Sequence, residues 1–425
     1  MFKSFQEAEA FFEYRKSAGI KPGTGRIDIL LRLLDSPQEK VKGIHVAGTN
    51  GKGSTVHFLE QALISNGYRT GVFTSPSLSG ITGHMLVNGE QISRVTFLQL
   101  CNQVLPAIQQ MDKTDNAPTE FEILTAIAFL YFSITTDIVL VEAGMGGRED
   151  TTNCFQPLVS IITNVAMDHM NFLGDKIEKI AWHKAGIIKP GIPAVIGKMP
   201  EEASLIIENE THVRKAETFM LGRNFSVTHH AGTTVIKLHN FTGFGERSFT
   251  VQLRMKGRHQ EINASLALVT LALIMGKGQN IDMDRSVRAI EQAQLPGRFE
   301  LVKGEPPIII DGAHNPAGME SFLQTVKDHY KDRETHLIFA AFQDKDTSTM
   351  LRQAVGQFDS ITVTSFEHPR AASADELDKM AGGLPVSVVD SWQDVLSQKR
   401  SQENACYFIA GSLHFIAEVR KFFLG

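Results

Sequence analysis

Short apolar runs alternate with longer apolar or amphipathic stretches through the first half of the chain. The longer stretches predict helices at about 54–66 and 120–134, and residues 1–36 are predicted to be mostly helical around a turn at 21–26. Strands alternating with helices favour an α/β fold with a mainly parallel sheet covered on both faces. The short runs that predict strands are 43–47, 70–74, 137–142 and 158–163.

The pattern changes after residue 225. Short polar-interrupted strands at 234–238 and 248–253 indicate hairpins, and a long helix is expected at about 261–275. Pro296-Gly297-Arg298 and the segment 303–307 then break the pattern. We therefore expect two domains, residues 1–297 and a smaller α/β domain at 298–425. The strands expected in the second are 308–310, 336–339, 360–363 and 407–409.

Composition narrows the class of protein. With 42% hydrophobic and 21% charged residues, the 425-residue chain is typical of a soluble globular protein of two domains. A net charge of −5 argues against a nucleic-acid-binding surface over the whole molecule. Cys101, Cys154 and Cys406 are widely spaced and predict a reducing compartment. Because the N-terminus lacks a signal pattern and no apolar run reaches the roughly 20 residues of a membrane span, we expect a cytoplasmic protein.

A glycine-rich segment follows the predicted strand at 43–47. Glycines there let backbone N–H groups approach phosphate oxygens, and the next helix adds its N-terminal partial charge. Lys52 would neutralise the β- and γ-phosphates, and Ser54 would contact phosphate or Mg²⁺. The alternative is a glycine-rich turn with a solvated lysine, because Gly53 stands where Ser or Thr is usual. The full segment is Gly48, Thr49, Asn50, Gly51, Lys52, Gly53 and Ser54.

This variant loop, GTNGKGS, resembles that of the Mur ligase superfamily, and further motifs resemble the folylpolyglutamate synthase and dihydrofolate synthase family. The resemblance covers nearly the whole chain. It implies a P-loop ATPase domain with a mainly parallel sheet at 1–297 and a smaller, Rossmann-like ligase domain at 298–425. The motifs follow in one order: Thr74-Ser75-Pro76, 118–122, 142–153, Asp168-His169, 184–187, 257–263, 296–298, 311–316, 344–346 and 411–413.

The resemblance also implies an activity, in which ATP activates a substrate carboxylate as an acyl phosphate that the amino group of L-glutamate then captures. Two Mg²⁺ ions are implied, with Ser75, Glu142 and His169 as ligands. Lys184 resembles a family lysine that is carbamylated, although His183 replaces the Glu that commonly precedes it. Catalytic roles fall to Lys52, Lys184 and His169. A base role for His169 competes with metal binding.

Nucleotide contacts carried over from the family are Asn263, Arg298, Asp311 and His314. A guanidinium such as that of Arg298 suits phosphate because its planar fork bonds two oxygens. The positions that resemble the pterin pocket are Arg26, Thr119, Phe121 and Asp150, where the Phe121 ring would stack on the substrate. For each of these residues a structural role, as a cap, turn, salt bridge or core residue, is the alternative.

The chain departs from the family in the loop Ser75–Glu90. Thr82-Gly83-His84 stands where the family usually has Asn-Glu-Arg, and His414 replaces the usual Tyr. These changes leave open whether the substrate is dihydropteroate, folates or both. They also motivate an alternative function, a nucleotide-binding protein that has lost ligase activity. A cell-wall amino-acid ligase would need a UDP-binding domain ahead of the loop, which we do not expect. We expect a monomer with small-molecule substrates and no nucleic-acid or membrane partner.

Overall fold

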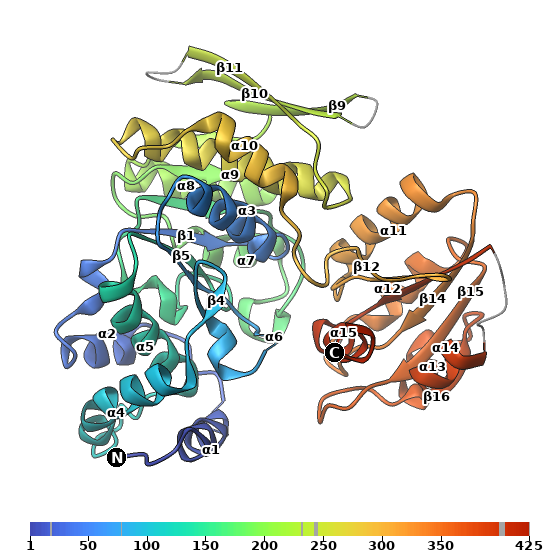
Figure 1. The fold of residues 1–425 in the computed structure, drawn as a ribbon, viewed down its shortest axis with the longest axis horizontal. Helices are drawn as coiled ribbons and strands as arrows, with labels where there is room; N and C mark the ends of the chain where they lie inside the picture. Colours follow the sequence, from blue (N-terminus) through green and yellow to red (C-terminus); the bar gives the residue numbers. More distant parts are fainter. Residues whose placement is uncertain (18, 78, 231–232, 242–244, 399–403, 425) are drawn as a thin grey trace. The chain divides into compact units, whose positions relative to one another are not determined.

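The computed structural model describes the chain except for residues 18, 78, 231–232, 242–244, 399–403 and 425. It forms two compact units (Figure 1). The first contains Met1–Gln252 and Glu261–Ala293, and the second contains Leu253–Gln260 and Gln294–Gly425. A single boundary at 297/298 was expected; in the structure the main change of unit lies at 293/294, and the short segment 253–260 belongs to the second unit. The division into an ATP-binding and a ligase domain stays a prediction.

The first unit is built on an eight-stranded sheet with the order β4-β3-β2-β5-β1-β6-β7-β8. Its six strands from β2 to β8 are parallel, and β3 and β4 add an antiparallel edge. The α/β fold with a mainly parallel sheet is confirmed. The strands are β1 (Gly43–Ala47), β2 (Thr70–Phe73), β3 (Met85–Val87), β4 (Glu90–Gln91), β5 (Ile138–Glu142), β6 (Val159–Ile162), β7 (Ala194–Ile196) and β8 (Thr218–Met220).

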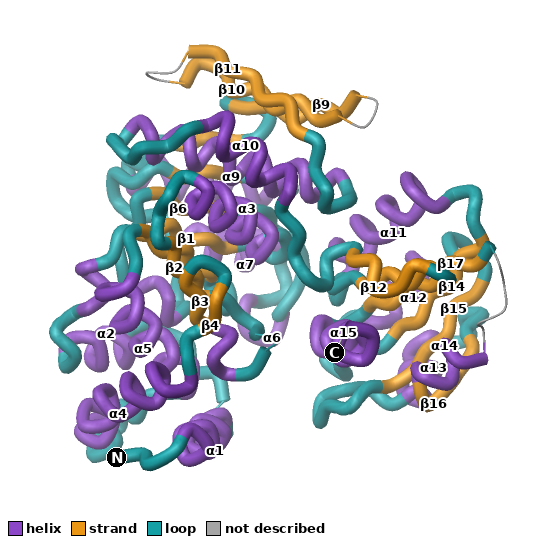
Figure 2. The backbone as a smooth tube through the Cα atoms, in the orientation of Figure 1, coloured by secondary structure: helices purple, strands orange, loops and turns teal. Residues whose placement is uncertain are grey.

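Helices lie on both faces of this sheet (Figure 2). One group packs through a core that includes α1, α2, α4 and α5, whereas α3 contacts β1, β2, β5 and α10. The α-helices are α1 (Phe5–Lys16), α2 (Gly25–Arg32), α3 (Lys52–Ser65), α4 (Arg94–Met111), α5 (Glu120–Thr135), α6 (Met170–Leu173), α7 (Ile177–Ala185), α8 (Glu201–Arg214), α9 (Arg258–Gly276) and α10 (Met283–Gln292). Short 3₁₀ turns are η1 (Pro37–Lys40), η2 (Ile81–His84) and η3 (Thr151–Cys154).

Helix α5 shows how the sequence sets this packing. Thr119 accepts from the backbone N–H of Glu122, whose carboxylate accepts from the Thr119 N–H, so a capping box fixes the first turn. The helix is apolar on nearly every side and is buried from Glu122 to Leu130. Gly71 of β2 lets Phe132 come close, since a Cβ there would lie 2.8 Å from the Phe132 ring.

A separate three-stranded antiparallel sheet with the order β11-β10-β9 confirms the expected hairpins. It is formed by β9 (Phe225–His230), β10 (Thr233–Phe241) and β11 (Gly245–Val251). Strand β11 contacts α10, beside which the sheet is drawn in Figure 1. Helix α9 begins at Arg258, three residues earlier than its predicted start at 261.

The second unit contains a six-stranded sheet with the order β12-β13-β17-β14-β15-β16, parallel except for β12. The prediction that 303–307 breaks the pattern was wrong for Lys303 and Gly304, which end β12, and for Pro307, which begins β13 and pairs with Gly304. The strands are β12 (Glu300–Gly304), β13 (Pro307–Ile310), β14 (Glu334–Phe339), β15 (Ser360–Ser365), β16 (Ser387–Ser391) and β17 (Ala405–Ala410). The helices are α11 (Pro316–Tyr330), α12 (Thr347–Ala354), α13 (Ala374–Ala381), α14 (Trp392–Gln398) and α15 (Leu413–Leu424).

Among the described residues, no helix is both long and apolar enough to cross a membrane.

The packing of α5 predicts that substitutions at two of its residues lower the stability by different amounts. Phe132 is 1% exposed and packs over Gly71, so Phe132→Ala should lower the free energy of unfolding of the first unit by about 3–5 kcal/mol. Ile134, on the same helix, is 78% exposed, so Ile134→Ala should change it by no more than about 0.5 kcal/mol. Urea unfolding of both variants measures the difference. Equal losses would contradict the packing described for α5.

Candidate functional site

The glycine-rich loop joins β1 to α3 at the carboxyl edge of the first sheet. Gly48 lies so close to the strand β6 end that a Cβ would sit 1.8 Å from Thr163 Oγ1. Gly51 has φ +83° and precedes the first residue of α3. These two positions need glycine, as expected for a loop whose backbone approaches an anion. Gly53 and Ser54 fall in the first turn of α3, which starts two residues earlier than predicted.

Residues that follow β6 hold this loop in place, and the sequence did not indicate them. Asn164 Oδ1 accepts from the N–H groups of Thr49, at 3.2 Å, and Asn50, at 2.9 Å. Thr163 Oγ1 donates to the Asn50 carbonyl at 2.6 Å. The signal for finding them is topological: β6 lies beside β1, so its carboxyl end must meet the loop.

Lys52 and Glu142 lie together, at the start of α3 and the end of β5. Lys52 Nζ donates to the Gly48 and Thr49 carbonyls at 3.1 and 3.3 Å and is 3.9 Å from Glu142 Oε1. Glu142 is 5% exposed and accepts from Thr74 Oγ1 at 2.5 Å. Ser75, which follows Thr74, has a buried hydroxyl with no hydrogen-bond partner among the described residues. The ends of β1, β2 and β5 thus bring a lysine, a carboxylate and a hydroxyl into one place.

Lys184, on α7, is buried at 2% exposure. Burial and the positive charge of Lys52 together lower its pKa to about 7, against opposing effects from Asp168 and Asp150. A neutral amine is therefore accessible near neutral pH, in contrast to an ordinary lysine with a pKa of about 10.4. Because the charge of Lys52 affects the pKa of Lys184, the two side chains lie near one another.

His169 starts α6 with a left-handed backbone at φ +51°. Its ring is half exposed, with Nε2 4.0 Å from Asp168 Oδ2. Over the described part of the chain, no three His, Cys, Asp or Glu side chains form a group that could hold a metal ion. Ser75 and Glu142 nevertheless suit Mg²⁺, which takes hard oxygen ligands, often only one or two of them carboxylates, and keeps several waters.

Asn263 is the predicted nucleotide contact that the structure places at the loop. It is buried on α9, and a Cβ on Gly51 would lie 2.4 Å from its Oδ1. The two residues are more than two hundred positions apart in sequence. The fold therefore brings Asn263 beside the glycine-rich loop.

The predicted pterin residues form a second group in the first unit. Arg26 Nε lies 3.0 Å from Oε1 of Glu122, which is fully buried and also caps α5 with Thr119. Phe121, which directly precedes Glu122 in the sequence, stacks on Phe73 with ring centroids 5.6 Å apart. Arg26 is thus oriented by a buried acid that the sequence did not single out for this role.

Gly144 connects Phe121 with Asp150. A Cβ at Gly144 would lie 2.6 Å from the Phe121 ring and 3.2 Å from Asp150 Oδ2. Asp150 is 7% exposed, and burial raises the pKa of its carboxyl group against hydrogen bonds from Thr152 and backbone N–H groups that lower it. All four predicted pterin residues therefore belong to one contiguous set of contacts.

The remaining predicted contacts gather in the second unit, where β13 ends. Asp311 accepts from the N–H groups of Phe299 and Ala313, both at 2.9 Å, and burial raises its pKa against the charge of Arg298. A Cβ at Gly312 would lie 2.1 Å from Arg298 Nη1. His314 Nδ1 bonds the Gly312 carbonyl at 2.7 Å. Arg298, Asp311 and His314 are therefore neighbours.

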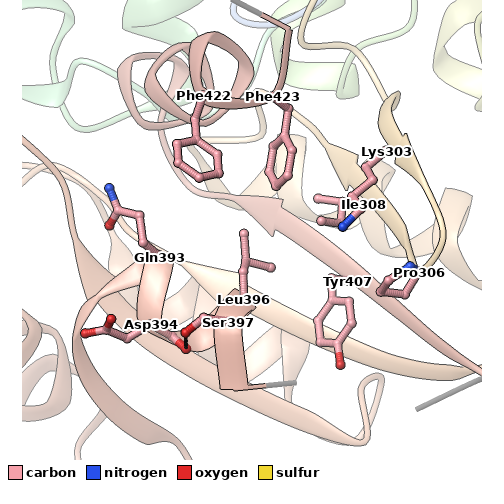
Figure 3. A pocket seen from close by; sticks show the side chains of 10 residues that line it. All are labelled: Lys303, Pro306, Ile308, Gln393, Asp394, Leu396, Ser397, Tyr407, Phe422 and Phe423. Carbon is pink, nitrogen blue, oxygen red and sulfur yellow. Dashed lines mark hydrogen bonds between the residues drawn. The ribbon is translucent and has the colours of Figure 1, made fainter. Parts of the chain in front are cut away.

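A cavity of about 190 Å³ in the second unit lies away from these residues (Figure 3). Figure 3 shows Tyr407, Phe422 and Phe423 around it, with Lys303 and Asp394 among the polar side chains. Ile308 and Tyr407 pair near the amino ends of β13 and β17, whereas Asp311 follows the carboxyl end of β13. None of the predicted site residues lines this cavity.

The described part of the altered loop contains η2 and leads into the β3-β4 hairpin. His84 Nδ1 bonds the Thr74 carbonyl at 2.7 Å, and burial lowers the pKa of its imidazole. A Cβ at Gly83 would lie 2.2 Å from Ser77 Oγ. Leu78, which belongs to this loop, lies outside the described residues.

Comparison with known proteins gives consistent matches. Residues 46–271 match the Mur ligase middle domain, and 297–413 match the Mur ligase glutamate ligase domain. The chain is 36% identical to a dihydrofolate synthase/folylpolyglutamate synthase of Bacillus subtilis over 99% of both chains. It resembles Mycobacterium tuberculosis folylpolyglutamate synthase complexed with ADP, with a TM-score of 0.89 and 30% identity over 99% of this chain and 98% of that one.

A structure of Escherichia coli FolC in complex with DHPP and ADP is also similar, with a TM-score of 0.88 and 26% identity over 99% of this chain and 97% of that one. Full-length coverage by a relative at 36% identity, together with both Mur ligase domains, shows the family. The chain belongs to the dihydrofolate synthase/folylpolyglutamate synthase family of Mur ligases, and it is an ATP-dependent, ADP-forming amino-acid ligase.

Proposed function

We propose that this chain adds L-glutamate to the carboxylate of a folate, with ATP as the source of activation. The observation that carries the proposal is the group at the ends of β1, β2 and β5, where Lys52 lies between the loop carbonyls and Glu142. The names of the relatives support the reaction, since the Bacillus subtilis protein is a dihydrofolate synthase/folylpolyglutamate synthase and the Mycobacterium tuberculosis structure contains ADP.

In the first step, a carboxylate oxygen of the substrate attacks the γ-phosphorus of ATP, and the bond from that phosphorus to the bridging oxygen breaks. The products are an acyl phosphate and ADP. The loop N–H groups and the α3 N-terminus would bind the phosphates, with Lys52 following the charge on the transferred group. Asn263 would contact the nucleotide from α9. Arg298, Asp311 and His314 stay predicted nucleotide contacts.

Ser75, Glu142 and His169 are the ligands we propose for Mg²⁺, with the Lys184 carbamate as a further anionic ligand. Support comes from the unpartnered Ser75 hydroxyl and the nearly buried Glu142 carboxylate. When bound, the cation would neutralise developing charge on the phosphate oxygens. A lysine carbamate suits this place because Lys184 is buried within range of the Lys52 charge, and carbamylation would replace a cation by an anion.

In the second step, the amine of glutamate attacks the acyl carbon, phosphate leaves, and the new amide nitrogen loses a proton. The His169 ring, half exposed beside Asp168, is the candidate base. Its two proposed roles exclude one another at a single nitrogen, because a metal-bound nitrogen has no lone pair for a proton. Phe121 and Asp150 would hold the pterin ring, with Thr119 and Arg26 alongside. The monomeric state and the cytoplasmic location stay predictions.

The sequence left open a second function, nucleotide binding without ligase chemistry, which the family match does not favour. Gly83 motivates it, because the acid usual in the family is lost from a loop that adjoins Ser75. ATP binding is common to both functions, so only the product distinguishes them.

A product assay by mass spectrometry tests the ligase. With ATP, Mg²⁺ and L-glutamate, we expect an amide product and ADP from tetrahydrofolate, and dihydropteroate as the second acceptor shows whether the enzyme is bifunctional. Lys52→Ala should lower the rate at least about 100-fold, because one charged donor to the transferred phosphoryl group is lost. Lys179→Ala, at an exposed lysine, should keep the rate. ATP binding with no amide from any pterin would favour the second function.

Carbamylation of Lys184 can be tested separately. The neutral amine attacks CO₂, a C–N bond forms and a proton is released, so the adduct should increase as pH rises through about 7. We expect a ¹³C carbamate signal from labelled bicarbonate at pH 8 that weakens at pH 6. Lys184→Arg should abolish the signal and lower activity roughly 10- to 100-fold. Lys179→Arg should change neither, and a signal that survives in Lys184→Arg would refute the assignment.

A further inference from the structure

A buried chain of hydrogen bonds runs from the middle of β1 to Asp150. His45 Nε2 lies 2.9 Å from Thr152 Oγ1, which lies 2.5 Å from Asp150 Oδ1. His45 and Thr152 are 0% exposed, and Asp150 is 7% exposed. The chain thus links a strand residue, which no role described above uses, to the carboxylate proposed to bind the pterin.

The direction of donation along this chain is fixed by counting hydrogens. The Thr152 hydroxyl has one hydrogen, which it donates to the Asp150 carboxylate. It must therefore accept from His45, which requires the hydrogen on Nε2. His45 Nδ1 is buried and has no hydrogen-bond partner in the part of the chain that the structure describes, and an unprotonated nitrogen there costs less than a buried N–H without an acceptor. Burial, assisted by the charge of Lys189, lowers the His45 pKa to about 3, so the imidazole is neutral.

The Asp150 carboxylate is held from both sides. Oδ1 also accepts from the Thr152 N–H at 3.0 Å, and Oδ2 accepts from the Met145 N–H at 2.7 Å. Gly144 then brings the Phe121 ring beside the same carboxylate. A flat ring stacked on Phe121 would present its edge N–H groups to an acceptor of fixed direction. The direction of the Asp150 carboxylate therefore decides how well the pterin ring binds.

We propose that His45 is a positioning residue for the pterin ring, because its Nε2–H fixes the Thr152 hydroxyl and thereby the direction of the Asp150 carboxylate. His45 does not touch the substrate. The inference rests on the proposed function, since it takes Asp150 as a substrate contact. The competing interpretation is a histidine that only fills the core beside Phe155, with ring centroids 5.2 Å apart.

Two variants separate these interpretations. His45→Leu keeps bulk but removes the donor, whereas His45→Gln places an amide N–H near the position of Nε2. We expect His45→Leu to raise the KM for the pterin substrate about tenfold, the equivalent of 1.4 kcal/mol, with the KM for ATP unchanged. His45→Gln should restore most of the affinity. His336→Leu, at a buried histidine of the second unit that bonds Ser360, should leave both KM values unchanged.

A KM for the pterin that is unaltered in His45→Leu, or raised equally in His45→Leu and His45→Gln, would overturn the proposal. If His45→Leu does not fold, His45→Asn replaces it, because its shorter amide does not reach Thr152. An independent readout is ¹⁵N NMR of histidine-labelled protein, where we expect the Nε2–H tautomer without titration between pH 5 and 8. The Nδ1–H tautomer would overturn the proposal even if no pterin were a substrate. If the wild-type protein has the Nε2–H tautomer but forms no amide product, that result counts against the proposed function alone.

Discussion

Repulsion between two lysines in one buried neighbourhood is the constraint on which the candidate site depends. Lys52 and Lys184 are close enough for the charge of one to lower the pKa of the other, and Lys184 has almost no access to water. A protein does not keep such a pair without anions to balance it. Glu142 supplies one carboxylate 3.9 Å from Lys52 Nζ, and Asp168 and Asp150 act on Lys184. The positive charge that remains suits the anionic ligands that we propose for this site.

The sheet explains why these groups meet. Strand β1 lies between β5 and β6, with the chain continuing through α3 to β2 on the far side of β5. In open parallel sheets, ligands bind at the carboxyl ends of strands where the order changes direction. Here those ends carry the glycine loop, Glu142, Asn164 and, after β2, Ser75. The second unit has a similar arrangement. Strand β17 lies between β13 and β14, and Asp311 and Gly411 follow the carboxyl ends of the neighbouring strands β13 and β17.

What could be predicted from the sequence was local. The strand at 43–47 was predicted with its observed bounds, and the glycine-lysine loop was recognisable because its chemistry lies within seven consecutive residues. Asn164 was not recognisable, because its role depends on the pairing of β6 with β1 across more than a hundred residues. Glu122 was read only as part of a helix-opening motif, although it both caps α5 and pairs with Arg26. The segment 253–260 could not be assigned to the second unit, because only tertiary contacts place it there. The roles assigned to individual residues by family resemblance stay predictions.

The departures in the Ser75–Glu90 loop form a consistent local arrangement rather than a damaged one. Gly83 leaves room for Ser77, because a Cβ at position 83 would lie 2.2 Å from the Ser77 hydroxyl oxygen. His84 uses Nδ1 to hold the Thr74 carbonyl, while the Thr74 hydroxyl donates to Glu142. The histidine that stands in place of the usual arginine thereby supports the residue next to Ser75. Thr74 bonds Glu142 directly beside the altered loop, and this arrangement is consistent with the ligase activity that the family match shows.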